Sequence, residues 1–112
     1  MPPPEKLDLL KGTLHLLILQ TIQYRPQHGH GIGQAIRANS DDLLQVEHGS
    51  LYPALHRLQE EGWITSEWGV SDNNQRAKFY SLTPAGRQQL KREDAKWKLF
   101  VQAMSRALRP QE

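Results

Sequence analysis

Apolar residues recur at helical spacing over the first part of the chain. Leu10, Leu14 and Leu17 follow one another at intervals of four and three residues, and neighbouring leucines and isoleucines widen this stripe. A wide apolar stripe is typical of a helix that is buried on most of its sides. The pattern predicts a helix over residues 9–24, after a flexible tail over residues 1–8.

A second, shorter stripe follows after a break. Pro26 ends the first helix because proline is incompatible with a helix interior, and we expect residues 28–30 to form a turn. Ile32 and Ile36 then lie one helical turn apart. They predict a second helix that reaches about Asn39, where serine and aspartate residues favour another turn.

The third stripe runs from Leu51 to Leu58. Serine is a favoured N-cap residue, so we expect Ser50 to cap this helix. Pro53 is then expected in the first turn, where proline is tolerated. Gly62 follows the stripe and is expected to end the helix. The sequence therefore predicts a short amphipathic helix in this region.

Two segments rich in aromatic and β-branched residues come next, at 63–68 and 77–82. Such residues are enriched in strands, and the polar stretch 69–76 between them suits a turn. We therefore expect an antiparallel hairpin with a long polar tip. Helix, helix, turn, helix and hairpin make up a winged helix-turn-helix, which we predict for residues 9–82. The predicted fold class is mainly α with a small β-hairpin.

A last helix is predicted over residues 83–109, with Thr83 as its N-cap and Pro84 at its first position. Its apolar residues follow heptad spacing, except that Asp94 occupies one apolar slot. Two copies of the chain could pair along this stripe; alternatively, the helix folds back onto its own domain. Across a two-fold axis the Trp97 indole could form a slot for a small aromatic ligand, or simply pack. The predicted dimerisation residues are Leu90, Trp97, Val101, Met104 and Leu108.

The polar side of the third helix carries groups that suit DNA. Recognition helices contact base edges and phosphates near their N-terminal end. The hydroxyls of Ser50 and Tyr52 can bond phosphate oxygens, and Arg57 can pair with a phosphate or with a guanine edge. The alternatives, that Ser50 only caps the helix and that Tyr52 only packs, remain open. The predicted DNA contacts on this helix are Ser50, Tyr52, Pro53, His56 and Arg57.

The hairpin tip carries further donors. Asn74, Arg76 and Lys78 follow one another without an intervening carboxylate, which suits contact with DNA phosphates. A solvated loop is the alternative interpretation. Nearby carboxylates would repel phosphate, so we expect these residues to point away from DNA: Glu60, Glu61 and Glu67.

The composition excludes several other classes of protein. At 112 residues and a net charge of +2, the chain suits one small domain whose overall charge neither favours nor excludes nucleic acid. The lack of cysteine excludes disulfides and thiolate metal sites.

His28 and His30 are close in sequence, but no further metal ligand accompanies them, so we expect surface or capping histidines and no metal. No catalytic motif, secretory signal or membrane-length apolar run occurs, so we expect a cytoplasmic protein without cofactor or enzymatic activity.

Several segments resemble the PadR family of transcriptional regulators, and they follow the family's order along nearly the whole chain. The most specific is Gly-Ser-Leu-Tyr-Pro-Ala-Leu, which begins at Gly49. His30 and Phe79 stand where the family more often has tyrosine, and both exchanges keep an aromatic ring. The resembling segments lie at residues 12–14, 28–32, 49–58, 62–64, 76–80 and 82–86.

This resemblance implies a homodimer that usually represses transcription and holds a roughly palindromic operator with its third helix and wing. It also implies that the C-terminal helix packs against the partner's N-terminal helix. Compared with long members of the family, we expect no larger C-terminal domain, which leaves effector sensing open. The alternative hypothesis is a winged-helix module that binds another protein and no DNA. The resemblance places DNA contacts on Ser50, Tyr52, Arg57, Arg76 and Lys78.

Overall fold

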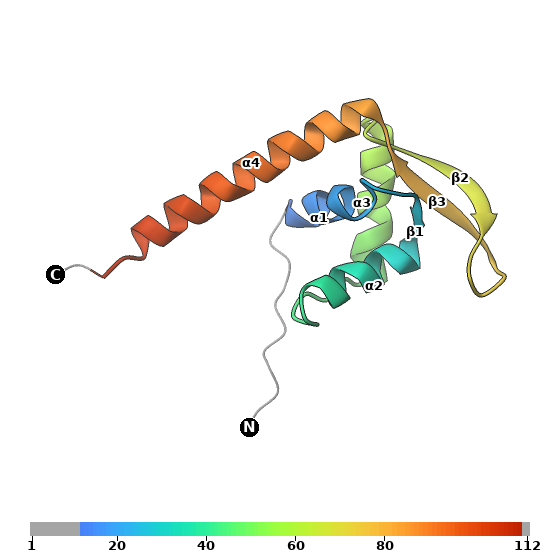
Figure 1. The fold of residues 1–112 in the computed structure, drawn as a ribbon, viewed down its shortest axis with the longest axis horizontal. Coiled ribbons are helices and arrows are strands. Elements are labelled where there is room, and N and C mark those ends of the chain that lie inside the picture. Colours follow the sequence, from blue (N-terminus) through green and yellow to red (C-terminus); the bar gives the residue numbers. More distant parts are fainter. Residues whose placement is uncertain (1–11, 111–112) are drawn as a thin grey trace, which may run out of the picture.

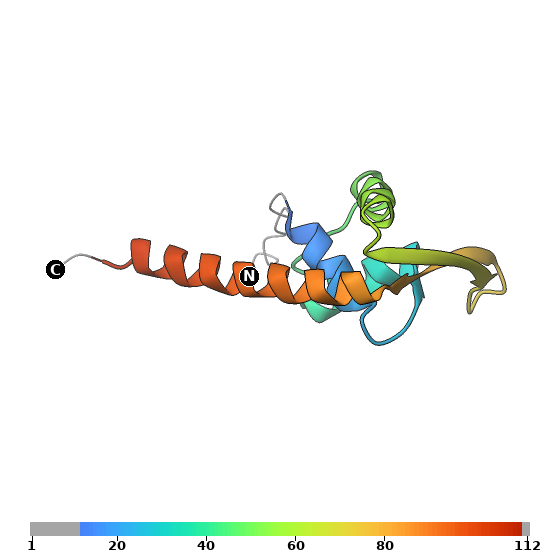
Figure 2. The same cartoon turned by 90° about the horizontal axis from the view of Figure 1, so that it is seen from above.

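The computed structural model describes residues 12–110, which form a helical cluster, a small sheet and one projecting helix. The elements are α1 (Thr13–Thr21), β1 (Gln27–His28), α2 (Gly29–Asn39), α3 (His48–Glu60), β2 (Ile64–Val70), β3 (Arg76–Leu82) and α4 (Pro84–Ala107). Helices α1, α2 and α3 pack together, and α4 leaves this cluster as a long arm (Figure 1). Seen from above, the arm and the β2–β3 hairpin extend to opposite ends of the molecule (Figure 2). The predicted tail over residues 1–8 lies outside the described residues.

The core forms where the three clustered helices meet the base of the sheet. Ile18 and Leu19 of α1 have no exposed surface, and Leu58 of α3 is equally buried. Full burial of one such side chain contributes about 1.5–3 kcal/mol to stability, so these contacts hold the cluster together. The buried core residues are Ile18, Leu19, Ile22, Ile32, Ile36, Leu51, Ala54, Leu55, Leu58, Ile64, Tyr80 and Leu90.

The sheet contains three antiparallel strands among the described residues, in the order β1-β3-β2. The hairpin of β2 and β3, with the turn over residues 71–75, is called the wing below. In its register Trp68 lies opposite Lys78, and Val70 lies opposite Arg76. Side chains alternate between the two faces of a strand, so these four share one face and Glu67 lies on the other. Toward the tip both strands extend further than predicted, which shortens the turn from residues 69–76 to 71–75, while β2 begins one residue later than predicted.

The predicted N-cap of α3 is wrong. The helix begins at His48, its N-cap is Glu47, and no side chain caps it. Ser50 therefore lies inside the first turn, where its N–H donates a hydrogen bond of 3.0 Å to the Glu47 carbonyl oxygen. Pro53 lies one turn later than expected, inside the helix and with its ring exposed. The end of the helix is as predicted, because Gly62 adopts a left-handed φ of 79° directly after the C-cap.

The first two helices also differ from prediction at their ends. Helix α1 ends at Thr21 rather than at residue 24, and residues 9–11 lie outside the described part of the chain. Residues 28–30 are not a simple turn: Gln27 and His28 pair with β3, and α2 begins directly afterwards. The His28 Nδ1 atom accepts a hydrogen bond of 3.0 Å from the Gly31 N–H and so caps α2. This agrees with the expectation of a capping histidine.

The start of α4 is as predicted, and it is firmly joined to the wing. Thr83 is the N-cap and accepts a hydrogen bond of 3.0 Å from the Gly86 N–H. Its hydroxyl also donates to the Gly62 carbonyl oxygen at 2.7 Å, and its N–H donates to the Trp63 carbonyl oxygen at 3.1 Å.

The predicted mainly α fold with a winged helix-turn-helix and a long C-terminal helix is confirmed, with β1 added to the sheet. No helix within residues 12–110 has the length and apolar character of a membrane span.

Candidate nucleic-acid interface

A surface hollow of about 390 Å³ lies between α3 and the wing. It brings together three of the predicted DNA contacts: Tyr52 from α3, and Arg76 and Lys78 from β3. His30 and Trp68 also line it, and none of its lining residues is acidic. We call this feature the wing hollow. Its position allows side chains from α3 and from the wing to contact the same ligand.

Tyr52 connects α3 to the first turn of α2. Its side chain is 46% exposed and lies so close to Gly29 that a Cβ atom at Gly29 would come within 2.8 Å of the Tyr52 hydroxyl oxygen. The His48 ring meets the Tyr52 ring edge to face at 5.9 Å. Burial raises the pKa of Tyr80, and the neighbouring Tyr52 raises this pKa further. The Tyr80 hydroxyl therefore keeps its proton at neutral pH.

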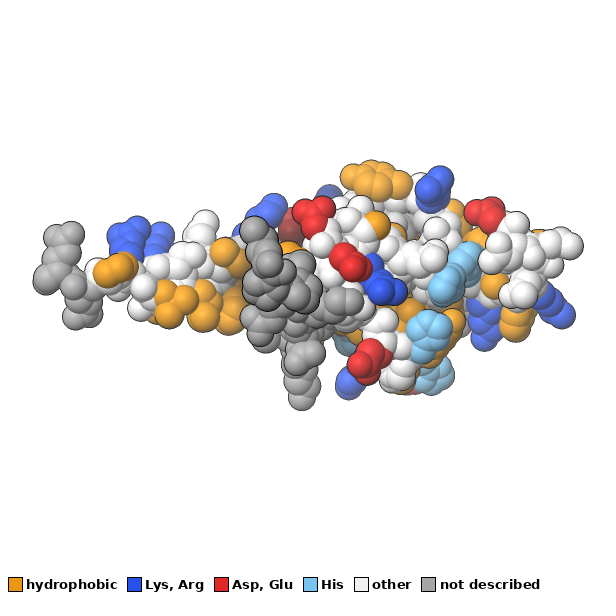
Figure 3. Space-filling view, turned by 90° about the horizontal axis from the view of Figure 1, so that it is seen from below, with side chains coloured by type: hydrophobic (Ala, Val, Ile, Leu, Met, Phe, Trp, Pro, Cys, Tyr) orange, Lys and Arg blue, Asp and Glu red, His pale blue; other side chains and the backbone are white. Residues whose placement is uncertain are grey.

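Three histidine rings form a row between Phe79 of β3 and Tyr52 of α3. His28 contacts Phe79 at 5.4 Å and stacks with His30 at 6.4 Å, and His30 in turn meets His48 at 6.2 Å. Histidine side chains gather on this face beside the wing (Figure 3). Among the described residues no three His, Cys, Asp or Glu side chains form a group able to hold a metal ion. The sequence could not reveal this row, because it joins residues from separate elements.

The two cations of the wing lie over an exposed indole. The Arg76 Cζ atom is 4.6 Å from the Trp68 ring centroid, and the Lys78 Nζ atom is 5.5 Å from it. Both distances fall within the range of cation–π attraction. Asn74 lies in the turn with a left-handed φ of 59° and is exposed. The sequence analysis predicted Asn74 and both cations as contacts but missed Trp68.

The other predicted contacts of α3 lie outside the wing hollow. Arg57 is on a different flank from Tyr52, close to His15 of α1. Burial lowers the pKa of His15, and the Arg57 charge lowers it further. His56 forms an ion pair of 2.7 Å with Glu60, so the Glu60 carboxylate lies beside a predicted DNA contact. The predicted DNA contacts of α3 therefore do not all lie on the wing hollow: Tyr52 lines it, and the others do not.

The apolar stripe of α4 begins later than predicted. Leu90 is only 7% exposed and belongs to the core of its own chain, so it is not available at the surface. The remaining predicted residues, Trp97, Val101, Met104 and Leu108, are exposed. Phe100, which the sequence analysis missed, stacks against Trp97 with ring centroids 5.9 Å apart.

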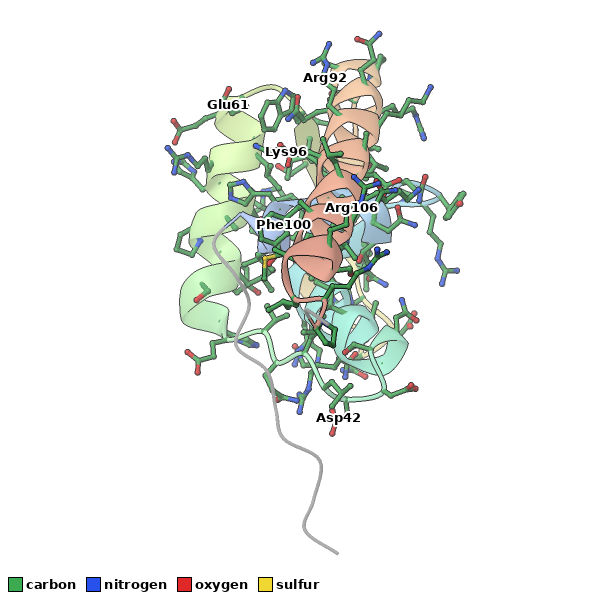
Figure 4. All side chains as sticks on the ribbon, turned by 90° about the vertical axis from the view of Figure 1, so that its left-hand side faces the viewer. Asp42, Glu61, Arg92, Lys96, Phe100 and Arg106 are labelled. Atoms are coloured by element: carbon green, nitrogen blue, oxygen red, sulfur yellow. The ribbon has the colours of Figure 1, made fainter. Side chains whose placement is uncertain are left out.

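Trp97 and Phe100 also line a hollow between α1 and α4. Its volume is about 220 Å³, and Leu16 of α1 forms part of the opposite wall. Lys96 and Phe100 lie on the side of α4 that is turned toward α1 and α3 (Figure 4). The exposed stripe and this hollow form one continuous apolar region, because Trp97 and Phe100 belong to both.

The sequence model of the Transcriptional regulator PadR-like family matches residues 18–92. This range covers the last part of α1, all of α2 and α3, the wing and the first part of α4. The chain belongs to the PadR-like family of transcriptional regulators. The resemblance found in the sequence motifs is thereby confirmed, and the chain is a regulator of a DNA-binding family.

Individual PadR-like relatives agree with this assignment. The chain is 34% identical over 80 residues to the transcriptional regulator Rv3488 of Mycobacterium tuberculosis, an alignment that covers 71% of each protein. It is 27% identical over 77 residues to the negative transcriptional regulator PadR of Bacillus subtilis, covering 69% of this chain and 42% of that protein. The structure of a transcriptional regulator from Clostridium thermocellum matches with a TM-score of 0.80 and 26% identity, covering 88% of this chain and 96% of that one.

Proposed function

We propose that this PadR-like regulator is a homodimeric repressor that binds palindromic operator DNA through α3 and the wing. The observation that carries the proposal is the wing hollow, where Tyr52, Arg76 and Lys78 converge without an acidic neighbour on its wall. In winged helices the third helix enters the major groove, and basic side chains neutralise backbone phosphates. The converging hydroxyl and cations suit a phosphate backbone that runs between α3 and the wing.

The surface of α4 supports a dimer. Trp97, Phe100, Val101 and Met104 form an exposed apolar stripe that another copy of α4, or the partner's α1, would cover. A two-fold axis would repeat the same surface on both subunits and present two copies of α3 to the DNA. Two-fold related recognition helices require two inverted half-sites, which is why we propose a palindromic operator.

Repression is supported by one relative, the negative transcriptional regulator PadR of Bacillus subtilis. Because this chain spans only part of that protein, the sign of regulation is carried over as a proposal. An aromatic ligand at Trp97 is also proposed. It is supported by the Trp97–Phe100 stack on the wall of the α1–α4 hollow, where a flat ring could insert.

The decisive experiment measures binding of the purified protein to the DNA upstream of its own gene and to duplexes selected from a random library. A scrambled duplex is the control, and each affinity is measured at 50 and 200 mM salt. We expect preferential binding that weakens by about tenfold or more over this range, since phosphate contacts release counterions. Equal or absent binding to every duplex would contradict the proposal and favour the protein-binding module.

A further inference from the structure

We propose that Trp68 is a positioning residue for DNA binding, whose indole holds Arg76 and Lys78 over the wing hollow. This inference rests on the proposed function and deepens it. It assigns a role to a side chain that the sequence motifs did not single out.

Trp68 has no evident role in the core. Its side chain is 59% exposed, and neither the buried core cluster nor the partly buried residues around that cluster include it. A large ring left in water forfeits the stabilisation that burial would give. The position is therefore poorly explained by folding alone.

The register of the wing places the ring where it can act on both cations. Lys78 lies directly opposite Trp68 in the β2–β3 pair, and Arg76 lies two residues further along β3 on the same face. Their charged groups are 5.5 Å and 4.6 Å from the ring centroid. Within residues 12–110 neither cation forms a salt bridge with a carboxylate. The indole is thus the aromatic partner that both charges share in this part of the chain.

Holding both charges against one ring favours binding in two ways. Long basic side chains lose rotamer freedom when they engage DNA, and a ring that already restricts them reduces that loss. The ring attracts each charge through its π face, but it does not neutralise the charge as a carboxylate would. Both cations therefore remain available to phosphate oxygens. Because no acidic residue lines the wing hollow, nothing on its wall repels the backbone.

The test compares operator affinity and its salt dependence among three single variants. Trp68→Leu keeps an apolar side chain but removes the π face, Trp68→Phe keeps a ring, and Thr65→Ala changes the opposite face of the same strand. We expect Trp68→Leu to bind about five- to tenfold more weakly with a shallower salt dependence. Trp68→Phe should recover most of this affinity, and Thr65→Ala should bind like the wild type.

A double-mutant cycle shows whether Trp68 acts through the cations. In an Arg76→Ala/Lys78→Ala background, Trp68→Leu should cause no further loss, because the ring has nothing left to position. An equal loss in that background would show that the ring contacts DNA by itself, and the proposal would be overturned. Wild-type affinity and salt dependence for Trp68→Leu would also overturn it. By contrast, failure of the proposed function would appear as absent binding by the wild-type protein.

A measurement on the unaltered protein covers the case in which a Trp68 variant does not fold. Side-chain NMR relaxation reports how strongly each arginine guanidinium is ordered. We expect Arg76 to be more ordered than Arg106, an exposed arginine near the end of α4. Equal mobility of the two guanidinium groups would refute the positioning role.

Discussion

At the scale of single residues, Tyr52 is the residue of α3 that lines the wing hollow. We expect Tyr52→Ala and Arg76→Ala each to weaken operator binding by about tenfold, because each change would remove the hydrogen bond that we propose with a charged phosphate. Both variants should remain dimers, since neither residue lies on the α4 stripe. Fluorescence anisotropy gives the affinity and sedimentation gives the oligomeric state. Gln59→Ala, an exposed change near the end of α3, is the control, and unchanged affinity in both variants would remove the assigned surface.

His15 gives the protein a pH-dependent stability. Burial and the Arg57 charge lower its pKa in the folded chain below the ordinary value of 6.5, and Glu93 opposes them in part. Below pH 6.5 the unfolded chain therefore takes up a proton more readily than the folded chain does. The contribution of His15 to stability is fully present above this pH and is lost as the pH falls toward the lower folded-state pKa.

We expect His15→Gln to reduce this loss. Urea unfolding midpoints measured between pH 7.5 and 5.5 should fall less for the variant than for the wild-type protein. An identical fall in both proteins would show that His15 stays equally protonated in the folded and unfolded states.

Where the residue type itself suggests chemistry, the sequence indicated which side chains would share a surface, while their contact with DNA stays a prediction. Arg76 and Lys78 are cations in a predicted wing, and the structure places both on the wing hollow with Tyr52. Trp68 could not be recognised, because an aromatic residue in a strand is ordinarily interpreted as packing. Its cation contacts depend on the pairing register of two strands. Similarly, Leu90 fits the spacing of the α4 stripe, yet its position beside the cluster makes it a core residue.

At the scale of elements, the helices and the wing could be predicted from apolar spacing, but their ends could not. Serine is the stronger capping residue, yet α3 begins at His48, and Glu47 is its N-cap in an extended conformation. β1 could not be predicted, because a strand of two residues is too short to show alternating apolar and polar positions. It is defined by its pairing with β3. Element types thus follow from local sequence, whereas their limits depend on tertiary contacts.

The junction between the wing and α4 depends on Gly86. A Cβ atom at this position would overlap the backbone carbonyl oxygen of Trp63, which cannot move without disturbing β2. We expect Gly86→Ala to lower the free energy of unfolding by about 1–3 kcal/mol, as overpacking does. Gly49→Ala is a matched control, because a Cβ atom there meets nothing within 4 Å. Chemical denaturation measures both, and equal stability of the two variants would contradict the close packing at Gly86.

At the scale of the whole molecule, the wing and the α4 arm lie at opposite ends of a body that measures 58 × 39 × 22 Å. The DNA contact and the subunit contact that we propose can therefore be made independently, and they can be tested separately. We expect Trp97→Asp combined with Val101→Asp to produce monomers, because a dimer would bury two unpaired charges. Leu99→Asp combined with Gln102→Asp, on the opposite side of α4, should leave the dimer intact. Sedimentation velocity distinguishes these results, and a dimer in the first variant would place the interface elsewhere.

We propose that two copies of α3 and two wings bind one operator together. Hydroxyl-radical footprinting of the protein on its selected operator tests this claim most directly. We expect two protected patches related by the operator's two-fold axis, with centres about 10 base pairs or a multiple of that distance apart. A single asymmetric patch, or no protection at concentrations that saturate binding, would contradict it.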